Sequence, residues 1–157
     1  MSVCKITEGV YSIGVLNPSL RVFDIIMETK YGTTYNAYFV QGSEKCALIE
    51  TVHAKYFDEY IENIASLTDV SKIDYLILNH TEPDHTGSIA RLLELNPSIE
   101  VVGTNAGIKY AGAISNANLN AKIVKQGDSI NLGGKTLEFI PSPFLHWPDS
   151  KFTYLPE

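Results

Sequence analysis

The sequence is poor in cysteine, in basic residues and in long apolar runs. It has 157 residues, with two cysteines and 12 lysines and arginines against 18 aspartates and glutamates, which gives a formal net charge of −6. Nucleic acids and anionic membranes attract basic patches, so this charge balance argues against both as partners. No apolar run approaches the roughly 20 residues that a bilayer-spanning helix needs. We therefore expect neither nucleic acid nor a membrane among its partners.

The two cysteines, Cys4 and Cys46, lie far apart in the sequence. The opening stretch MSVCKITEGVYSIG lacks the charged start, apolar middle and small-residue cleavage site of a signal peptide. Both observations predict reduced cysteines in a cytoplasmic protein rather than a disulfide. Cys46 lies in the apolar stretch KCALIE, so we expect it to be a small buried hydrophobe. Cys4 is expected to be a surface thiol.

With 45% apolar residues, the chain has enough hydrophobic material for one domain with a core. Its early part predicts antiparallel strands. Two of these, YNAYFVQG and KCALIETV, are expected to form a hairpin because a short Gly-containing connection joins them. The middle part alternates short apolar runs with helical periodicity, and the final part returns to strands. This order predicts an α/β (α+β) sandwich, with helices packed outside mixed sheets. The expected strands are GVYSIGVL, RVFDIIMET, YNAYFVQG, KCALIETV, KIDYLILN, IEVVGT, AKIVKQ, TLEFIPSP and KFTYL, and the expected helices are AKYFDEYIENIASL, GSIARLLEL and NAGIKYAGAIS.

Four side chains able to bind a cation fall within six positions of LNHTEPDHTGS, directly after the apolar run KIDYLILN. They are His80, Glu82, Asp84 and His85. Alternate residues share a face only in extended backbone, so we expect a loop or strand extension here, with His85 pointing toward a second, adjacent ion. Pro83 supports this expectation because it disfavours helical geometry at the preceding residue. A polar loop after a buried strand is also where α/β proteins place their chemistry.

The competing interpretation is that these are ordinary polar residues after a strand, with Thr86 and Asp84 as caps of the next helix, GSIARLLEL. Two imidazoles and two carboxylates so close together favour a metal site, because a cation offsets the cost of crowding them. Two further histidines are available. His146 lies in the Pro-bracketed loop SPFLHWPDS after a strand, and we expect it to be a ligand. His53 directly precedes a helix, and we expect it to cap that helix or to face solvent.

The segments HTEPDH, HWPDS and YGTTYNAYFV together resemble the diiron domain of flavodiiron proteins, also called A-type flavoproteins or rubredoxin:oxygen oxidoreductases. The resemblance covers nearly the whole chain. It implies a metallo-β-lactamase-like αββα fold, of which residues 1–157 form the N-terminal part, without the later strands and helices and without the flavodoxin-like domain. Hydrolases of that fold carry H-x-H-x-D-H, and Glu82 stands here in place of the second imidazole. Hard oxygen donors suit iron.

The resemblance also implies a ligand set for a dinuclear iron centre. His80, Glu82 and His146 would bind one iron, and Asp84 and His85 would bind the other. A bridging aspartate and one more histidine complete the centre in the family, and we expect neither in these 157 residues. The family reduces dioxygen to water, nitric oxide to nitrous oxide, or both, with electrons from FMN that a rubredoxin-like carrier supplies. We predict no catalytic residues beyond the metal ligands.

Two alternatives remain open at this point. One is a hydrolase of the same fold, in which a dinuclear zinc site activates water. The other is a non-catalytic remnant that binds one metal weakly or none. Tyr35, Tyr38 and Trp147 are candidates for tuning the choice between oxygen and nitric oxide. The ending KFTYLPE resembles the first arm of a hairpin, so we expect an unpaired strand edge and either a homo-oligomer or a partner chain that completes the fold.

Overall fold

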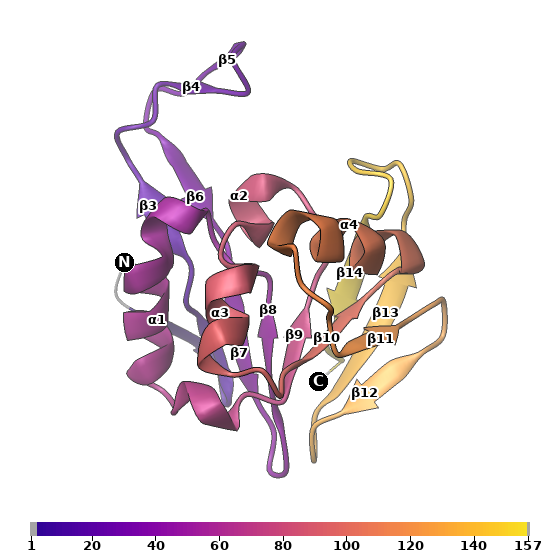
Figure 1. Ribbon diagram of the computed structural model, residues 1–157. Coiled ribbons are helices and arrows are strands. Elements are labelled where there is room, and N and C mark those ends of the chain that lie inside the picture. The colour runs from indigo at the N-terminus through magenta and orange to yellow at the C-terminus, as the bar shows by residue number, and fades with distance from the viewer. Residues whose placement is uncertain (1–2, 157) are drawn as a thin grey trace.

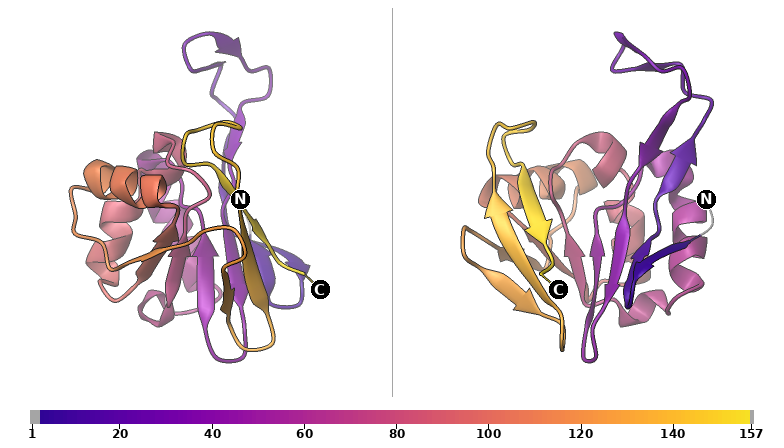
Figure 2. Two further views of the ribbon diagram at one scale, coloured as in Figure 1. Left: turned by 90° about the vertical axis from the view of Figure 1, so that its right-hand side faces the viewer. Right: turned by 180° about the vertical axis from the view of Figure 1, so that it is seen from behind.

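A seven-stranded sheet runs through the centre of the molecule, with helices on one face and a smaller sheet on the other (Figure 1; Figure 2). The computed structural model describes residues 3–156. The strands of the large sheet, in spatial order, are β1 (Cys4–Thr7), β2 (Val10–Ser12), β7 (Tyr38–Gln41), β8 (Cys46–Ile49), β9 (Tyr75–Ile77), β10 (Glu100–Gly103) and β11 (Ala121–Ile123). The small sheet consists of β12 (Ser129–Asn131), β13 (Thr136–Pro141) and β14 (Lys151–Tyr154). This layering is the N-terminal part of the predicted αββα sandwich.

Four α-helices and two short 3-10 turns connect the strands within residues 3–156. They are η1 (Ala54–Tyr56), α1 (Phe57–Ala65), η2 (Val70–Lys72), α2 (Pro83–Thr86), α3 (Ile89–Leu95) and α4 (Asn105–Ser115). The helical period of residues 54–67 is confirmed, because Phe57, Tyr60 and Ile64 of α1 are all buried. None of the helices in this part of the chain combines the length and apolar content needed to cross a bilayer.

The central strands are buried on both faces because their side chains alternate between two cores. Leu48 and Leu76 belong to the core beneath the helices, whereas Ala47 and Ile77 belong to the core beneath the small sheet. A period of two along a strand sends successive side chains to opposite faces, so a continuous apolar run is what a doubly covered strand requires. Cys46 joins the helix-side core as a free thiol, and Cys4 is exposed and also free, as predicted.

The strand directions bring several loops to one edge of the large sheet. β7 and β8 form the predicted antiparallel hairpin, and β8, β9 and β10 are parallel to one another. The carboxyl ends of parallel strands lie at the same edge, so the loops that leave β8, β9 and β10 gather there. The loop between β13 and β14 reaches the same end of the molecule (Figure 1).

The segment RVFDIIMET is not the single strand that its composition predicts. It divides into β4 (Val22–Phe23) and β5 (Met27–Glu28), a small hairpin whose turn places Asp24 and Ile25 at positive φ. This hairpin extends from the pair β3 (Val15–Asn17) and β6 (Thr33–Tyr35) and projects beyond the sheets (Figure 1). Its apolar side chains meet no core: Ile25 and Ile26 are 94% and 84% exposed. Strand β12 was not predicted.

Candidate metal centre

The ligand-rich segment leaves β9 at the gathered edge of the large sheet, and its first half has the predicted extended backbone. Glu82 has φ −59° and ψ 137°, which is not helical. The second half departs from the prediction, because Pro83 begins the single turn α2 and places Asp84 and His85 on a helix. Thr86 does not cap α3. Its hydroxyl donates to the carbonyls of Thr81 and Glu82, and Ser88 occupies the cap position.

Three of the five predicted ligands converge on one point. One potential ligand atom from each of His80, Glu82 and His146 lies within 4.8 Å of the other two. Nε2 of His146 lies 2.9 Å from Oε2 of Glu82, and Nε2 of His80 lies 3.4 Å from the same oxygen. His146 comes from the β13–β14 loop, 64 residues further along the chain than Glu82. The fold therefore joins two distant loops around one carboxylate.

Asp84 and His85 form a second contact beside the first. Nε2 of His85 lies 3.7 Å from Oδ2 of Asp84. The imidazole rings of His80 and His85 have their centroids 4.7 Å apart, so the two contacts are neighbours. The five side chains thus fall into a group of three and an adjacent group of two.

A further carboxylate, Glu50, was not identified from the sequence. It follows β8, has φ 63° and is 4% exposed. Its Oε2 lies 3.4 Å from Nδ1 of His80 and 3.4 Å from Nδ1 of His85. Its Oε1 accepts hydrogen bonds from the backbone N–H groups of Asn79 and His80. Glu50 therefore holds the segment and faces the Nδ1 edge of both rings, which leaves each Nε2 directed elsewhere. The only sequence signal was a charge at the end of the apolar run KCALIE.

The backbone around Glu50 is anchored on both sides. The hydroxyl of the fully buried Tyr60 donates to the carbonyl of Glu50 at 3.1 Å. The hydroxyl and the N–H of Thr51 both donate to the carbonyl of His85, at 2.6 and 3.1 Å. A positive φ at a glutamate costs energy, and these contacts show how the surrounding structure fixes it.

The crowded charges shift the pKa values of two of the side chains. Burial by itself lowers the pKa of His80, but the contact with Glu50 and the nearby charges of Glu82 and Asp84 outweigh burial, so the pKa lies above its ordinary value. Burial raises the pKa of Asp84, and the charge of Glu82 adds to this rise while His85 opposes it. The rise for His80 therefore comes from the carboxylates around it, and the rise for Asp84 comes mainly from burial.

The donor set fits a metal ion. One buried carboxylate oxygen of the predicted ligand set, Oδ1 of Asp84, has no hydrogen-bond partner within residues 3–156. Buried polar atoms are normally paired, and unpaired ones call for an explanation such as an ion. Imidazole and carboxylate donors together suit iron, and a bound cation would offset the charge that the carboxylates accumulate.

A chain of contacts links the centre to β14. The side-chain oxygen of Asn79 accepts from the hydroxyl of Thr153 at 2.6 Å and from Nζ of Lys151 at 3.3 Å. Lys151 is only 3% exposed, and its Nζ lies 4.6 Å from the centre of the Phe139 ring. Burial lowers the pKa of Lys151 to about 7, although the charge of Glu50 opposes this. No pattern in the segment KFTYL had indicated a buried lysine.

His53 stays outside the ligand cluster, as predicted. It precedes η1, and its Nδ1 accepts a hydrogen bond from the backbone N–H of Lys55 at 3.1 Å. Tyr35 is buried beside it, with ring centroids 5.7 Å apart. Trp147 follows the candidate ligand His146, and their ring centroids are 6.5 Å apart. Tyr38 is a strand residue on β7.

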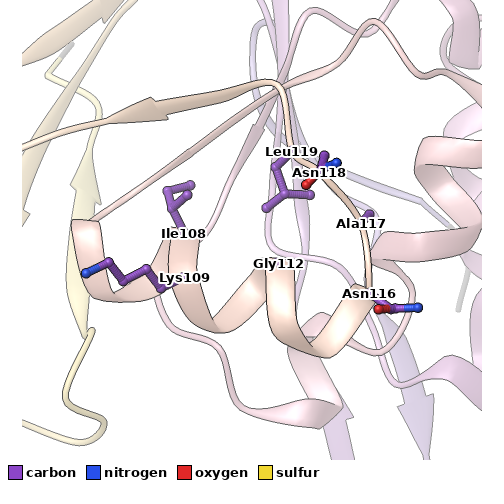
Figure 3. Close-up of a pocket in the computed structure, with 7 residues that line it drawn as sticks. All are labelled: Ile108, Lys109, Gly112, Asn116, Ala117, Asn118 and Leu119. Carbon is purple, nitrogen blue, oxygen red and sulfur yellow. The ribbon is translucent and has the colours of Figure 1, made fainter.

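An open cavity of about 540 Å³ lies apart from this centre, beside α4 and the loop that follows it (Figure 3). Of the residues that line it, only Lys109 is ionisable. The lining therefore lacks the imidazole and carboxylate groups that a metal or an acid–base pair would use. We assign the chemistry to the cluster at the sheet edge instead.

Comparison with known proteins connects the fold to one family. The sequence model described as "ODP family beta lactamase" matches residues 33–157. The chain is 56% identical over 159 residues to flavo-diiron protein FprA2 of Clostridium acetobutylicum, covering 100% of this chain and 40% of the relative. It is 42% identical over 154 residues to the nitric oxide reductase of Moorella thermoacetica, covering 97% and 38%. The chain thus spans about two fifths of the length of these curated relatives.

Solved structures give the same result. The flavodiiron protein from Giardia intestinalis matches with a TM-score of 0.93 and 30% identity, covering 99% of this chain and 38% of the other. Rubredoxin oxygen:oxidoreductase from Desulfovibrio gigas matches with a TM-score of 0.92 and 34% identity, covering 98% and 38%. The predicted fold is confirmed along nearly its full described length.

Proposed function

Since the chain belongs to the flavodiiron proteins, as a member of the ODP family of beta-lactamase domains, we propose that it is the metal-binding part of a reductase of dioxygen, nitric oxide or both. Residues 1–157 would form the N-terminal part of the diiron domain. One observation carries the proposal: ligand atoms of His80, Glu82 and His146 approach to within 4.8 Å of one another at the edge of the sheet.

In this proposal His80, Glu82 and His146 hold one iron, and Asp84 and His85 contribute to the second. The two groups of contacts described above support that division. Iron suits the proposal better than zinc, because Glu82 supplies a hard oxygen donor at the position where hydrolases of this fold have an imidazole. When bound, the metal pair would supply two adjacent centres that change valence and take a small substrate.

The chain's own residues prepare the site. Oε2 of Glu50 faces Nδ1 of His80 and of His85, which favours the tautomer with hydrogen on Nδ1 and leaves the Nε2 lone pair for a metal. Through Oε1, Glu50 also holds the backbone at Asn79 and His80. The carboxylates of Glu82 and Asp84 neutralise part of the positive charge that a metal would bring. We call Glu50 a positioning residue.

Electrons would come from FMN, which a rubredoxin-like carrier reduces, and both would lie outside the described residues. The names of two similar proteins support the substrates and the donor: one is a nitric oxide reductase and the other a rubredoxin oxygen:oxidoreductase. We further propose a cytoplasmic location and a homo-oligomer, or a partner chain that completes the fold.

Anaerobic reconstitution of the chain with iron(II), followed by metal analysis, tests the proposal. We expect iron to be retained after desalting and to be lost when His146 is replaced in His146→Ala, because that change removes one of three converging donors. Glu82→Gln should also lose iron, since an amide oxygen is a weaker ligand than a carboxylate.

The matched control is Glu44→Gln, an exposed glutamate on the β7–β8 turn at the opposite end of the sheet (Figure 1). It removes the same charge without touching the cluster and should bind iron as the native chain does. Retention of iron by both ligand variants would contradict the assignment. Preference for zinc over iron, with hydrolysis of an ester or phosphodiester, would favour a hydrolase instead.

A further inference from the structure

The candidate ligand His146 comes from the exposed tip of the β13–β14 loop. Phe144 and Leu145 are 79% and 68% exposed, and the side chain of His146 is 63% exposed. Burial resumes directly afterwards, because Asp149 and Lys151 are each only 3% exposed. An exposed loop tip takes its position from the segments that anchor its ends, so the position of His146 depends on this buried segment.

Lys151 ties the buried segment to the other ligand loop. Its backbone N–H donates to the carbonyl of Asn79 at 2.8 Å, and its Nζ donates to the side-chain oxygen of Asn79 at 3.3 Å. Asn79 directly precedes the candidate ligand His80. These contacts fix the start of β14 beside His80.

Asp149 lies against the first turn of α4. Oγ1 of Thr104, the N-cap residue, donates to the carbonyl of Asp149 at 3.3 Å and accepts the N–H of Gly107 at 3.1 Å. Oδ2 of Asp149 lies 3.3 Å from the place that a Cβ on Gly107 would occupy. The carboxylate therefore lies over the N-terminal end of the helix, where the missing side chain of Gly107 leaves room for it.

Both carboxylate oxygens of Asp149 are buried, and neither has a hydrogen-bond partner within residues 3–156. A buried polar group is normally paired, and a buried charge needs something that offsets its cost. The first N–H groups of a helix have no partners within the helix and carry partial positive charge, so they attract a carboxylate. This attraction holds the backbone three residues beyond His146.

We propose that Asp149 is a positioning residue for the metal centre: its carboxylate, held at the N-terminus of α4, sets the place of His146 relative to Glu82. The carboxylate itself contributes no metal ligand. The inference rests on the proposed function, because it needs a metal that His146 binds. It makes α4 part of the support of the site, although none of its residues is a candidate ligand.

Metal binding by an Asp149 variant tests this role with two readouts. Competition with a chelator gives the iron(II) affinity, and the visible absorption of the cobalt(II)-loaded chain reports the number and geometry of the donors. Asp149→Asn keeps the size of the side chain but removes the charge that the helix attracts. Losing a residue that orients a ligand typically weakens metal binding 10- to 100-fold, and we expect about 10-fold weaker iron binding here. The cobalt bands should move toward those of His146→Ala.

Gly107→Ala disturbs the same contact from the helix and leaves the loop sequence and every charge unchanged. Its Cβ would crowd Oδ2 of Asp149 and Oγ1 of Thr104, each at 3.3 Å, so the carboxylate has to move. We expect weaker iron binding, by a smaller factor than in Asp149→Asn. Gly112→Ala is the matched control in the same helix. Its Cβ would meet only the carbonyl oxygen of Ala117, at 3.5 Å, and its iron affinity should equal that of the native chain.

Thermal unfolding of each metal-free variant is measured first, and Gly107→Ala decides the outcome if Asp149→Asn does not fold. Native iron affinity and native cobalt bands in the folded variants of Asp149 and Gly107 would overturn this inference and leave the proposed function standing. Equal losses of affinity in Gly107→Ala and Gly112→Ala would also overturn it, because the effect would then belong to the helix and not to the contact. A native chain that binds neither iron nor cobalt would overturn both the inference and the proposed function.

Discussion

Glu50 is the side chain through which two candidate ligands are oriented, and it defines the first prediction. Glu50→Gln keeps the size and the Oε1 acceptor, but it replaces Oε2 with a donor that faces Nδ1 of His80 and His85. Loss of such a supporting contact typically costs about 10- to 100-fold in metal affinity. We expect that loss for iron, measured by competition with a chelator.

The same variant separates positioning from folding. In the metal-free chain, Glu50→Gln removes a buried charge but sets an amide donor against Nδ1 of both rings, so its thermal stability should fall modestly. A loss of stability with unchanged iron affinity would contradict the role given to Glu50.

Lys151 gives a prediction about pH. Burial lowers its pKa from 10.5 to about 7, so between these values the unfolded chain binds a proton that the folded chain does not. Stability therefore rises with pH across this window, and the cost of the buried charge is present in full below about pH 7. At about 1.4 kcal/mol per pKa unit, the effect on the free energy of unfolding is on the order of 5 kcal/mol.

Urea unfolding of the metal-free chain across this pH range tests the argument. Lys151→Met should be more stable than the native chain at neutral pH, and the gap should close as the pH approaches 10.5, the ordinary value. Lys122→Met, on the exposed strand β11, is the control and should leave the pH dependence as it is. If the difference in unfolding free energy between Lys151→Met and the native chain did not change with pH, the buried lysine would not be titrating in this range.

The contact between the β7–β8 turn and the small sheet gives a prediction about how the two sheets are coupled. Backbone N–H groups of Glu44 and Lys45 donate to the carbonyl of Leu132 at 3.1 and 3.0 Å. A Cβ on Gly42 would lie 1.9 Å from the same carbonyl oxygen, so the two sheets would have to separate.

We therefore expect Gly42→Ala to lower the free energy of unfolding by about 1–3 kcal/mol, the usual cost of overpacking. Gly112→Ala, within α4, is the control. The Cβ of an alanine there would meet only the carbonyl oxygen of Ala117, at 3.5 Å. Replacing a glycine inside a helix with alanine raises the free energy of unfolding by roughly 0.5–1 kcal/mol. Equal stabilities for the two variants in chemical denaturation would show that the turn does not couple the sheets.

The strands and helices that could be predicted from the sequence are those in which the spacing of apolar side chains reflects which positions are buried. Phe57, Tyr60 and Ile64 repeat at helical spacing because one face of α1 meets the core. The hairpin at residues 22–28 was read as one strand because Ile25 and Ile26 have the composition of a buried strand, although they are exposed. Composition records the residue type, whereas exposure there depends on a turn at Asp24 and Ile25.

The candidate site was predicted in part for a similar reason. Close spacing marked His80 and Glu82, but Pro83 was used only as a residue that ends helical geometry before it. Proline also starts helices at their first position, and that property places Asp84 and His85 on α2. Glu50 reaches the site only because parallel strands bring β8 beside β9, which no local pattern records.

Taken together, the three layers leave one sheet partly uncovered, and this gives the last prediction. β14 pairs only with β13 within residues 3–156, and on that sheet Phe152 and Tyr154 are each 52% exposed. An open strand edge beside apolar side chains promotes association. We expect the 157-residue chain to sediment above its monomer mass of 17.4 kDa, increasingly so at higher concentration.

Phe152→Lys should shift the chain toward monomer, because an edge lysine opposes strand pairing. Ile25→Lys on the projecting hairpin is the matched control, and a larger shift there would place the contact on the hairpin instead; a monomeric native chain at all concentrations would contradict both.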